Sequence, residues 1–454
     1  MSHCQTVRTA MLFPSRTAAR PECTAPDAAA TRPAPRRRAP IARWLAAAAL
    51  VVAMPAQAAW FVWTMVELPM SSGASCGNGT PYRFFVNTTP FSGNTAITFE
   101  GGGACWAQRA CEGQGQYSAT NPDGIPTNYM SQVNSAAGGL VTPFSARLDP
   151  FQGVSTQGWN LVYMPYCTGD VHTGNQVAVF SEADPANPRV QHFAGQANVR
   201  AASAWLRQHL GRPSQLMLTG FSAGGVAATA EYAVVRDALA PTGKTTLLAD
   251  SGPLFNAPLG GTAAQYPSLP LQTKIRSTWG LDGPQGLIPA LMQTLPGLDR
   301  NNMGSLNVAL AQKYPNDRFG YMLFQADATF SGFSYYDFYP AIQNQPDPNV
   351  QKQMMNVLWR QDIAQWTPTL ASQPNVSWWI PFYRDFNNSH CLTIVDFSGT
   401  GIEDQGYGDV SPFIDANLSH GAVLRKTEAD QASDLTRPLS LAMTILSIVL
   451  SLFG

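Results

Sequence analysis

Charge is scarce in this sequence and almost balanced. Only 13% of its 454 residues are charged, whereas a typical soluble domain has roughly 25%. The 28 lysines and arginines are offset by 29 aspartates and glutamates, so the net charge is −1. A protein that binds nucleic acid needs an excess of basic side chains to neutralise phosphates. This composition therefore argues against nucleic acid as a partner.

The sequence also lacks the clusters of side chains that hold a metal ion. It contains no Cys-x-x-Cys pair, and its histidines and cysteines form no group with the spacing of a zinc site. A metal site is therefore not expected. Hydrophobic residues nevertheless reach 45% of the chain, which is enough for a large core and too much for a disordered protein.

Residues 1–58 have the pattern of an export signal rather than of a folded domain. A basic stretch, Arg36–Arg43, precedes the apolar run Trp44–Met54, and Ala56-Gln57-Ala58 resembles a signal-peptidase site. The apolar run is too short to span a bilayer comfortably. We therefore expect a signal peptide near residues 36–58 and a secreted or periplasmic protein, with an N-terminal membrane anchor as the alternative.

After residue 58, short apolar runs alternate with helical segments. Asn198–His209 places apolar side chains at helical spacing, and the alanine-rich stretch Ala223–Ala240 predicts a second helix. This alternation predicts an α/β fold with a mostly parallel sheet flanked by helices. The predicted strands are Ala59–Val66, Arg83–Val86, Ala96–Phe99, Leu161–Met164, Leu216–Thr219, Thr245–Leu248 and Ser377–Trp379.

We expect one large domain over residues 59–425, because the chain shows no internal repeat and no clear linker. Within it, residues 255–316 contain helical pieces that either cover the mouth of an active site or pack on the sheet. The tail 426–454 ends in the apolar run Leu439–Phe453, which is shorter than the roughly 20 residues needed to span a bilayer. A tail docked on protein is therefore favoured over a membrane tail.

The segment Gly220-Phe221-Ser222-Ala223-Gly224 is the strongest catalytic signal in the chain. It lies between a predicted strand and a predicted helix, which is the context of a nucleophile elbow. The glycines permit a strained turn that exposes the serine hydroxyl, and the helix N-terminus favours developing negative charge. Ser222 is thus the expected nucleophile. The alternative is a tight turn in which the serine only caps the helix.

A glycine run, Gly101-Gly102-Gly103, follows Glu100 at the end of another predicted strand. Acyl transfer needs backbone N–H groups that point at the oxyanion, and a glycine-rich loop after an early strand provides them in esterases. We expect the N–H groups of Gly102, Gly103 and Ala223 to form the oxyanion hole. A phosphate-binding loop is not expected, because the Gly-Lys-[Ser/Thr] ending of such loops is missing.

On an α/β-hydrolase fold, the members of a triad follow one another in the order Ser, Asp or Glu, His. Two histidines, His390 and His420, come after Ser222. His390 is favoured because it lies in a polar loop that follows a predicted strand. The candidate acids between nucleophile and base are Asp250, Asp327 and Asp337.

Five segments occur in a specific order over about residues 72–400: Cys76–Thr80, Glu100–Gly103, Tyr166–Gly174, Gly220–Gly225 and Ser389-His390. Together they resemble the pectin acetylesterase/Notum family of carboxylesterases. The resemblance implies an α/β-hydrolase fold and a Ser-Asp-His triad, which needs no metal or organic cofactor. In the family the acid lies in a segment similar to Phe324–Thr329, and this similarity favours Asp327.

The resemblance also implies a pairing of the cysteines. Five of the seven lie after residue 58, and disulfides persist in an exported protein. Cys105 would pair with Cys111 behind the glycine run, Cys76 would pair with Cys167, and Cys391 would remain free. The alternative is five reduced and buried thiols.

Two further groups of residues each have two possible roles. Asp170 and His172 either line the substrate pocket or stabilise a turn. The aromatic residues of the segment 333–339 either stack on sugar rings or pack in the core.

The sequence therefore predicts a secreted serine esterase that hydrolyses acyl esters, with O-acetyl groups on a polysaccharide as the expected substrate. Ser222 would attack the ester, His390 would act as base and then acid, and Asp327 would orient the imidazole. One alternative is a lipase- or thioesterase-like hydrolase of longer acyl chains. The other is a catalytically silent carbohydrate-binding protein on the same fold.

Overall fold

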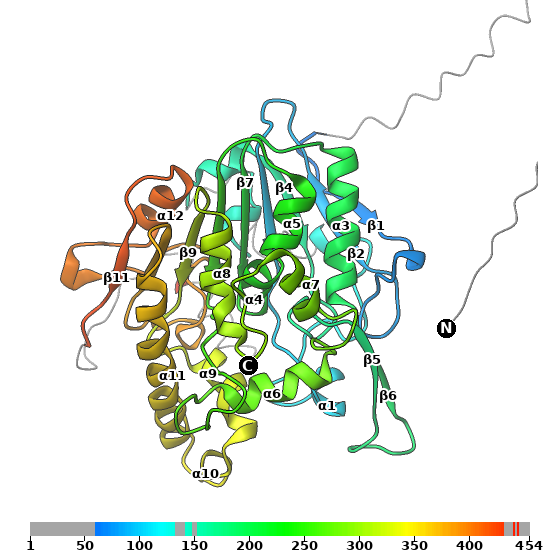
Figure 1. Cartoon of the computed structure of the whole chain (residues 1–454), viewed down its shortest axis with the longest axis vertical. Helices are drawn as coiled ribbons and strands as arrows, with labels where there is room; N and C mark the ends of the chain where they lie inside the picture. Colours follow the sequence, from blue (N-terminus) through cyan, green and yellow to red (C-terminus); the bar gives the residue numbers. More distant parts are fainter. Residues whose placement is uncertain (1–59, 132–140, 148–151, 431–438, 441–442, 445–454) are drawn as a thin grey trace, which may run out of the picture. The chain divides into compact units, whose positions relative to one another are not determined.

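A sheet of nine strands forms the centre of the fold (Figure 1). The computed structural model describes residues 60–131, 141–147, 152–430, 439–440 and 443–444. The strands are β1 (Thr64–Glu67), β2 (Arg83–Asn87), β3 (Thr95–Phe99), β4 (Asn160–Met164), β7 (Leu216–Phe221), β8 (Thr245–Asp250), β9 (Arg318–Met322), β10 (Val376–Ile380) and β11 (Arg425–Thr427). They lie in the order β1-β2-β4-β3-β7-β8-β9-β10-β11, and all pairs from β4 to β11 are parallel.

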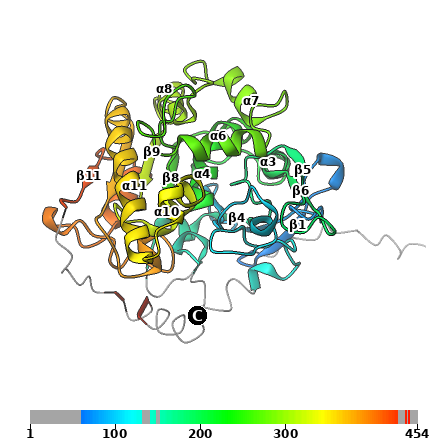
Figure 2. The same ribbon diagram turned by 90° about the horizontal axis from the view of Figure 1, so that it is seen from below.

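Helices pack on both faces of this sheet (Figure 2). They are α1 (Gln108–Cys111), α3 (Gly195–His209), α4 (Ala223–Ala230), α5 (Tyr232–Leu239), α6 (Leu269–Thr278), α7 (Leu287–Thr294), α8 (Leu306–Lys313), α9 (Ala328–Tyr335), α10 (Pro340–Gln343), α11 (Pro348–Ala371) and α12 (Ser411–Leu418). In β7, Leu216 and Leu218 contribute to a core shared with α3, α4, α5, α8 and α11. Met217 contributes to a second core, which includes α12.

The central strands are buried along their whole length. Every residue of β3, β4 and β8 is buried, which is the pattern of parallel strands with helices on both faces. The predicted α/β-hydrolase-like fold with a mostly parallel sheet is confirmed.

The helix predicted over Ala223–Ala240 is wrong in one respect, because the chain forms two helices there. The backbone leaves the helical conformation at Glu231, where φ is −94° and ψ is 2°. Helix α4 then packs on β7 and β8, whereas α5 packs on α3. The break lets each half bury its apolar side chains against a different neighbour.

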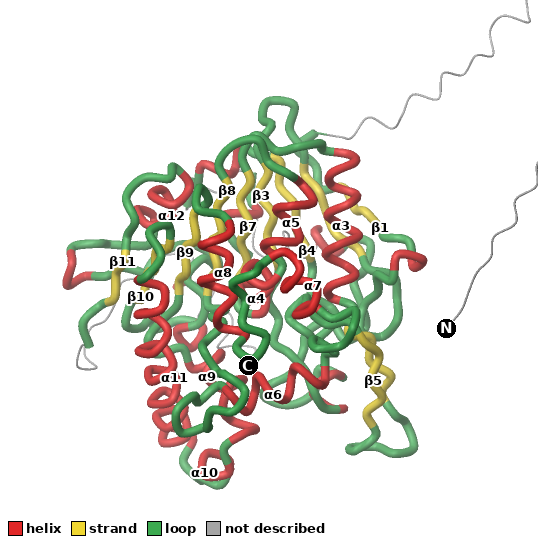
Figure 3. The backbone as a smooth tube through the Cα atoms, in the orientation of Figure 1, coloured by secondary structure: helices red, strands yellow, loops and turns green. Residues whose placement is uncertain are grey.

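A small hairpin lies outside the central sheet. Its strands, β5 (Gln176–Phe180) and β6 (Arg189–Phe193), pair with each other in antiparallel fashion. The hairpin extends away from the sheet (Figure 3). It was not predicted, because alternation over five residues is a weak signal in an isolated stretch.

Two disulfides tie the loops at one end of the sheet. Cys76 is bonded to Cys167 and Cys105 to Cys111, while Cys391 is buried and free. The pairing implied by the family resemblance is thus confirmed. The first bond links positions 91 residues apart, and closing a loop of that size lowers the entropy of the unfolded chain by an amount equivalent to about 4–5 kcal/mol.

Both ends of the chain extend beyond the described residues. The predicted signal peptide near residues 36–58 lies outside them, as does most of the tail 426–454. Of the apolar end of the tail, Met443 is described and packs in a small cluster with Phe386 and Val395. Within the described ranges, no helix has the length and apolar character to cross a membrane.

Candidate active site

The carboxyl ends of the parallel strands bring the predicted site residues to one edge of the sheet. Ser222 directly follows β7, Glu100 and the glycine run follow β3, and Asp327 comes five residues after β9. His390 lies in the loop after β10. Helices α6 and α9 lie at this end of the sheet (Figure 1). Such an edge is where α/β enzymes place their ligands.

Ser222 occupies a strained turn between β7 and α4. Its φ of 58° and ψ of −124° are unfavourable for a residue with a side chain. Neighbouring glycines allow the turn, since a Cβ on Gly220 would lie 2.2 Å from the Gly224 carbonyl oxygen and one on Gly224 would lie 2.0 Å from the Phe99 oxygen. The Ser222 side chain does not cap the helix. This geometry is that of a nucleophile elbow.

His390 and Asp327 form a buried pair beside the elbow. The two atoms His390 Nδ1 and Asp327 Oδ2 lie 2.8 Å apart, and the side chains are 6% and 0% exposed. Asp327 also caps α9, because its Oδ1 accepts hydrogen bonds from the N–H groups of Thr329 and Phe330. The carboxylate is therefore fixed on both sides. Its bond to Nδ1 leaves Nε2 of a neutral imidazole free to accept a proton.

The loop that carries His390 is anchored to the strand beside the elbow. Asp250, at the end of β8, accepts hydrogen bonds from the N–H groups of Leu392 and Thr393 at 2.9 and 2.7 Å. The adjacent Ser251 Oγ accepts a bond of 2.9 Å from the N–H of Cys391. Asp250 therefore holds the loop that carries His390, while Asp327 is the carboxylate bonded to the imidazole. Sequence reasoning missed this role, because it depends on a contact across 142 residues.

The other candidates for the base and the acid lie elsewhere. His420 Nε2 is 3.2 Å from the carbonyl oxygen of Thr245, which begins β8 and so lies at the opposite edge of the sheet from Asp250. Asp337 accepts a hydrogen bond from Trp106 Nε1 at 3.2 Å. Neither is bonded to His390.

The glycine run forms a tight loop facing Ser222. Gly103 has a φ of 68°, and a Cβ at this position would lie 2.1 Å from the Ser118 carbonyl oxygen. Within the described ranges, the N–H groups of Gly102, Gly103 and Ala223 have no hydrogen-bond acceptor. Each of these residues lines a hollow that Ser222 also lines. The three donors are thus open to a ligand atom at the nucleophile.

Asp170 and His172 lie behind this loop. Asp170 is fully buried and accepts hydrogen bonds from the N–H groups of Gly174 and Gly195 at 3.1 and 2.9 Å. His172 Nε2 donates to the Glu100 carbonyl oxygen at 3.0 Å, and burial lowers the pKa of this histidine to about 4. Of the two roles left open by the sequence, the structural one fits these contacts. Neither residue lines the hollows beside Ser222.

Glu100 is a buried carboxyl group at the base of the glycine run. Its side chain accepts hydrogen bonds of 2.8 Å from the hydroxyls of Tyr129 and Tyr163 and from the N–H of Tyr166. Burial raises the pKa of Glu100 to about 7, although these bonds oppose the change. The sequence marks this residue through its place before the glycines, but the burial and the tyrosine partners come from distant segments.

We expect this group to make stability fall as pH rises from about 5 to about 7. The pKa of Glu100 is higher in the folded protein than its ordinary value of 4.5, so the folded state binds more protons in this range. One such proton changes the free energy of unfolding by about 1.4 kcal/mol per pH unit. Thermal unfolding of Glu100→Gln across this range should show a smaller decline than the wild type.

The matched control is Glu403→Gln, because Glu403 is exposed. That variant should keep the wild-type dependence on pH. A second buried carboxyl group, Asp362, also has a pKa raised to about 7 by burial, so part of the decline should persist in Glu100→Gln. Equal pH profiles for Glu100→Gln and the wild type would contradict the assignment.

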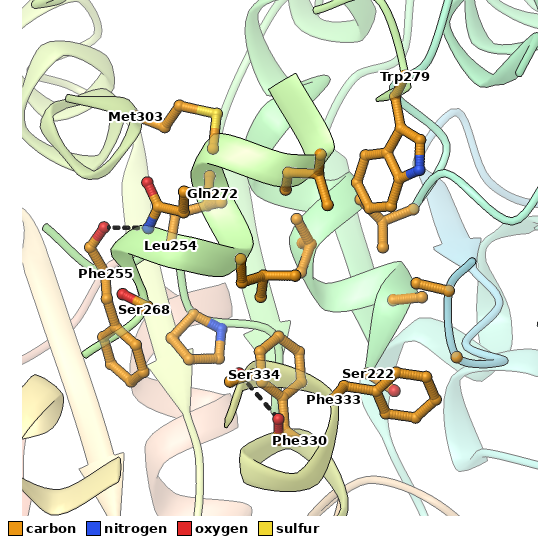
Figure 4. Close-up of a pocket in the computed structure, with 18 of the residues that line it drawn as sticks. Ser222, Leu254, Phe255, Ser268, Gln272, Trp279, Met303, Phe330, Phe333 and Ser334 are labelled. Carbon is orange, nitrogen blue, oxygen red and sulfur yellow. Dashed lines mark hydrogen bonds between the residues drawn. The ribbon is translucent and has the colours of Figure 1, made fainter. Parts of the chain in front are cut away.

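Two hollows of different character meet at Ser222. The apolar pocket has a volume of about 70 Å³ and is lined by Val226, Leu254, Ile275, Trp279, Met303 and Phe330, among others (Figure 4). The polar cleft is open and larger, about 550 Å³, and its lining includes Gln116, Ser118, Thr120, Asn121, Asn387 and His390. Gly103, Ser222 and Phe333 line both.

The lining of the apolar pocket shows whether residues 255–316 lie at the site or only pack on the sheet. Ile275 from α6, Trp279 and Met303 all come from this segment and line the pocket beside Ser222. The segment therefore contributes to the site. Helix α6 itself was not predicted, although its Leu271 and Ile275 stand at helical spacing. In the described ranges, no three His, Cys, Asp or Glu side chains are grouped as metal ligands.

The architecture is an α/β-hydrolase fold with a nucleophile elbow. Residues 55–266 match the profile of the pectinacetylesterase family. Pectin acetylesterase 5 of Arabidopsis thaliana is 28% identical over 202 residues, which cover 43% of this chain and 44% of that protein. The palmitoleoyl-protein carboxylesterase NOTUM of Schmidtea mediterranea is 24% identical over 162 residues, or 35% and 28% of the two chains. The matched part of the chain, residues 55–266, is thus similar to the pectinacetylesterase/Notum family of carboxylesterases.

A solved structure, the Wnt deacylase Notum from Drosophila, has the same fold. Its TM-score is 0.50 at 17% identity, with 82% of this chain and 98% of that chain covered. The matches to the curated relatives span less than half of their length. Ser222 and the glycine run lie inside the region of the family profile, whereas Asp327 and His390 lie beyond it. The case for these two residues therefore rests on geometry.

Proposed function

We propose that the protein is a serine carboxylesterase with Ser222, His390 and Asp327 as its catalytic triad. The observation that carries the proposal is the 2.8 Å contact between His390 and Asp327 at the cleft that Ser222 also lines. The match of residues 55–266 to a family of esterases supports the same activity. The two disulfides suit a protein made for secretion or for the periplasm.

The reaction follows from these positions. Ser222 Oγ attacks the acyl carbonyl carbon as its proton passes to His390 Nε2, and the N–H groups of Gly102, Gly103 and Ala223 bind the oxyanion. The C–O bond to the alcohol then breaks, and the alcohol leaves with the proton from His390. Water attacks the acyl-enzyme as one of its protons passes to His390. The C–O bond to Ser222 then breaks, Ser222 Oγ takes that proton from His390, and the carboxylic acid is released. Asp327 stabilises the imidazolium in both halves.

The proposed substrates are short acyl esters, with O-acetyl groups on a polysaccharide first among them. A second candidate is an ester with a longer acyl chain. The apolar pocket beside Ser222 favours this second candidate, because each buried methylene contributes about 0.8 kcal/mol.

A chain-length series of p-nitrophenyl esters tests both candidates. We expect hydrolysis of the acetate and butyrate esters, and a decline of kcat/KM for acyl chains too long for the apolar pocket. The measurement is release of p-nitrophenol by the purified protein. A preference for dodecanoyl or longer chains would replace the first candidate with the second. If no ester is hydrolysed, the remaining candidate is a catalytically silent carbohydrate-binding protein on the same fold.

A further inference from the structure

The arrangement of the two hollows fixes how an ester must lie, provided that the proposed esterase function holds. His390 lines the polar cleft but not the apolar pocket. Because the histidine gives its proton to the departing alcohol, that alcohol must lie on the side of His390. The acyl group then takes the apolar pocket, and the carrier of the ester occupies the polar cleft.

The side chains that line the polar cleft include several groups that form hydrogen bonds without charge. Gln116, Thr120 and Asn387 are exposed in it, and Ser118 and Asn121 are half-buried. No lysine, arginine or aspartate lines it among the described residues. Its one carboxyl group, Glu100, is 8% exposed. Amides and hydroxyls of this kind both donate to and accept from the hydroxyls of a sugar.

The hollow that adjoins the cleft supplies no free cation among its described lining residues. The adjoining hollow shares Asn387 with the cleft and contains Asp385 and Arg384. Arg384 is only 1% exposed, and its guanidinium donates to the carbonyl oxygens of Cys391 and Ser398. Asp385 is exposed. Within the described part of the chain, an anionic carrier would therefore meet a carboxylate and no available basic partner in these two hollows.

Phe333 contributes an aromatic ring to the lining of the cleft. Behind it, Tyr117 packs against Phe333 and Tyr336 with ring centroids 5.2 and 5.3 Å away. All three rings are partly exposed. Ring faces held in this way offer an apolar surface to the C–H face of a sugar ring.

We propose that the carrier of the ester is an uncharged polysaccharide rather than a polyuronate. A polyuronate has a carboxylate on each sugar, and in this cleft these charges would meet neutral donors and no cation, with the Asp385 carboxylate in the adjoining hollow. Neutral hydrogen bonds compensate a charge less well than an ion pair does, and this difference discriminates against the charged carrier. A neutral chain meets hydroxyls, amides and the ring of Phe333, which are groups that it can use.

The test compares two polymers acetylated to the same degree, glucomannan and polygalacturonate, with p-nitrophenyl acetate as the reference substrate. We expect kcat/KM for acetate release to be at least about tenfold higher on glucomannan. The inference is overturned if the protein hydrolyses p-nitrophenyl acetate but releases acetate from glucomannan no faster than from polygalacturonate. Inactivity on all three substrates overturns the proposed esterase function instead.

A matched pair of variants tests the physical cause. Gln116 lines the cleft, whereas Gln293 is exposed on α7 and does not. Gln116→Lys should raise kcat/KM on acetylated polygalacturonate by about threefold, the effect of one exposed ion pair, and Gln293→Lys should not. The gain should disappear in about 1 M salt, where the screening length falls to about 3 Å. Equal effects of the two lysines would contradict a role for charge in the cleft.

Discussion

Replacing Ser222 with alanine should abolish ester hydrolysis and leave the fold intact. The elbow holds this side chain between two hollows, where its hydroxyl is the expected nucleophile. Loss of the nucleophile of a triad lowers kcat by a factor on the order of 10⁶. Stability should change by less than about 0.5 kcal/mol, because the Ser222 hydroxyl makes no hydrogen bond within the described ranges.

Labelling with a fluorophosphonate gives a second readout of the same residue. Peptide mapping of the wild type should recover the probe on Ser222, and Ser222→Ala should not be labelled. Ser277→Ala is the control, since Ser277 is exposed on α6 and its loss should change neither activity nor labelling. Probe on another serine, together with an active Ser222→Ala, would show that the nucleophile lies elsewhere.

Replacing His390 or Asp327 should cause the next largest loss of kcat. His390→Ala removes the base and should lose nearly all activity. Asp327→Asn should lower kcat by about 10⁴, because an amide that donates to Nδ1 selects the wrong tautomer of the imidazole. The remaining side-chain oxygen of that variant would still accept the hydrogen bonds from the N–H groups of Thr329 and Phe330. The helix cap and the fold should therefore survive, which thermal unfolding can check.

The controls for this pair are two other candidates from the sequence, His420 and Asp337. His420 is bonded to Thr245 at the far edge of the sheet, and Asp337 is bonded to Trp106. His420→Ala and Asp337→Asn should therefore keep substantial activity if they fold. Loss of activity in His420→Ala, with His390→Ala still active, would contradict the proposed base.

Local features of the chain were enough to predict most of the fold and the turns of the site. Glycines around Ser222 and after Glu100 mark conformations that other residues rarely adopt, so the elbow and the glycine run stand out in the sequence alone. Chain order then reduced six histidines to two. The catalytic roles of Ser222, Asp327 and His390 stay predictions until the variants above are measured.

Other features depend on contacts that no local pattern encodes. The break at Glu231 follows from the packing of α4 and α5 on different neighbours. Asp250 supports the histidine loop through bonds that span more than a hundred residues. The apolar pocket combines Val226 with Ile275 and Met303 from a distant segment. Only the folded chain brings such residues together. Valine, isoleucine and methionine are common in any hydrophobic core, so their presence in the sequence does not mark a pocket.

The bond between Cys105 and Cys111 has a practical consequence for anyone who makes this protein. It closes a short ring directly after the glycine run, whose N–H groups face Ser222. In a host cytoplasm, where thiols stay reduced, this ring would remain open while the buried sheet, whose described strands contain no cysteine, could still form. We expect a preparation of that kind to look folded by its secondary structure and yet to hold the N–H groups of Gly102 and Gly103 loosely. Low activity in such a preparation would then reflect the compartment in which the protein was made and would not count against the proposed triad.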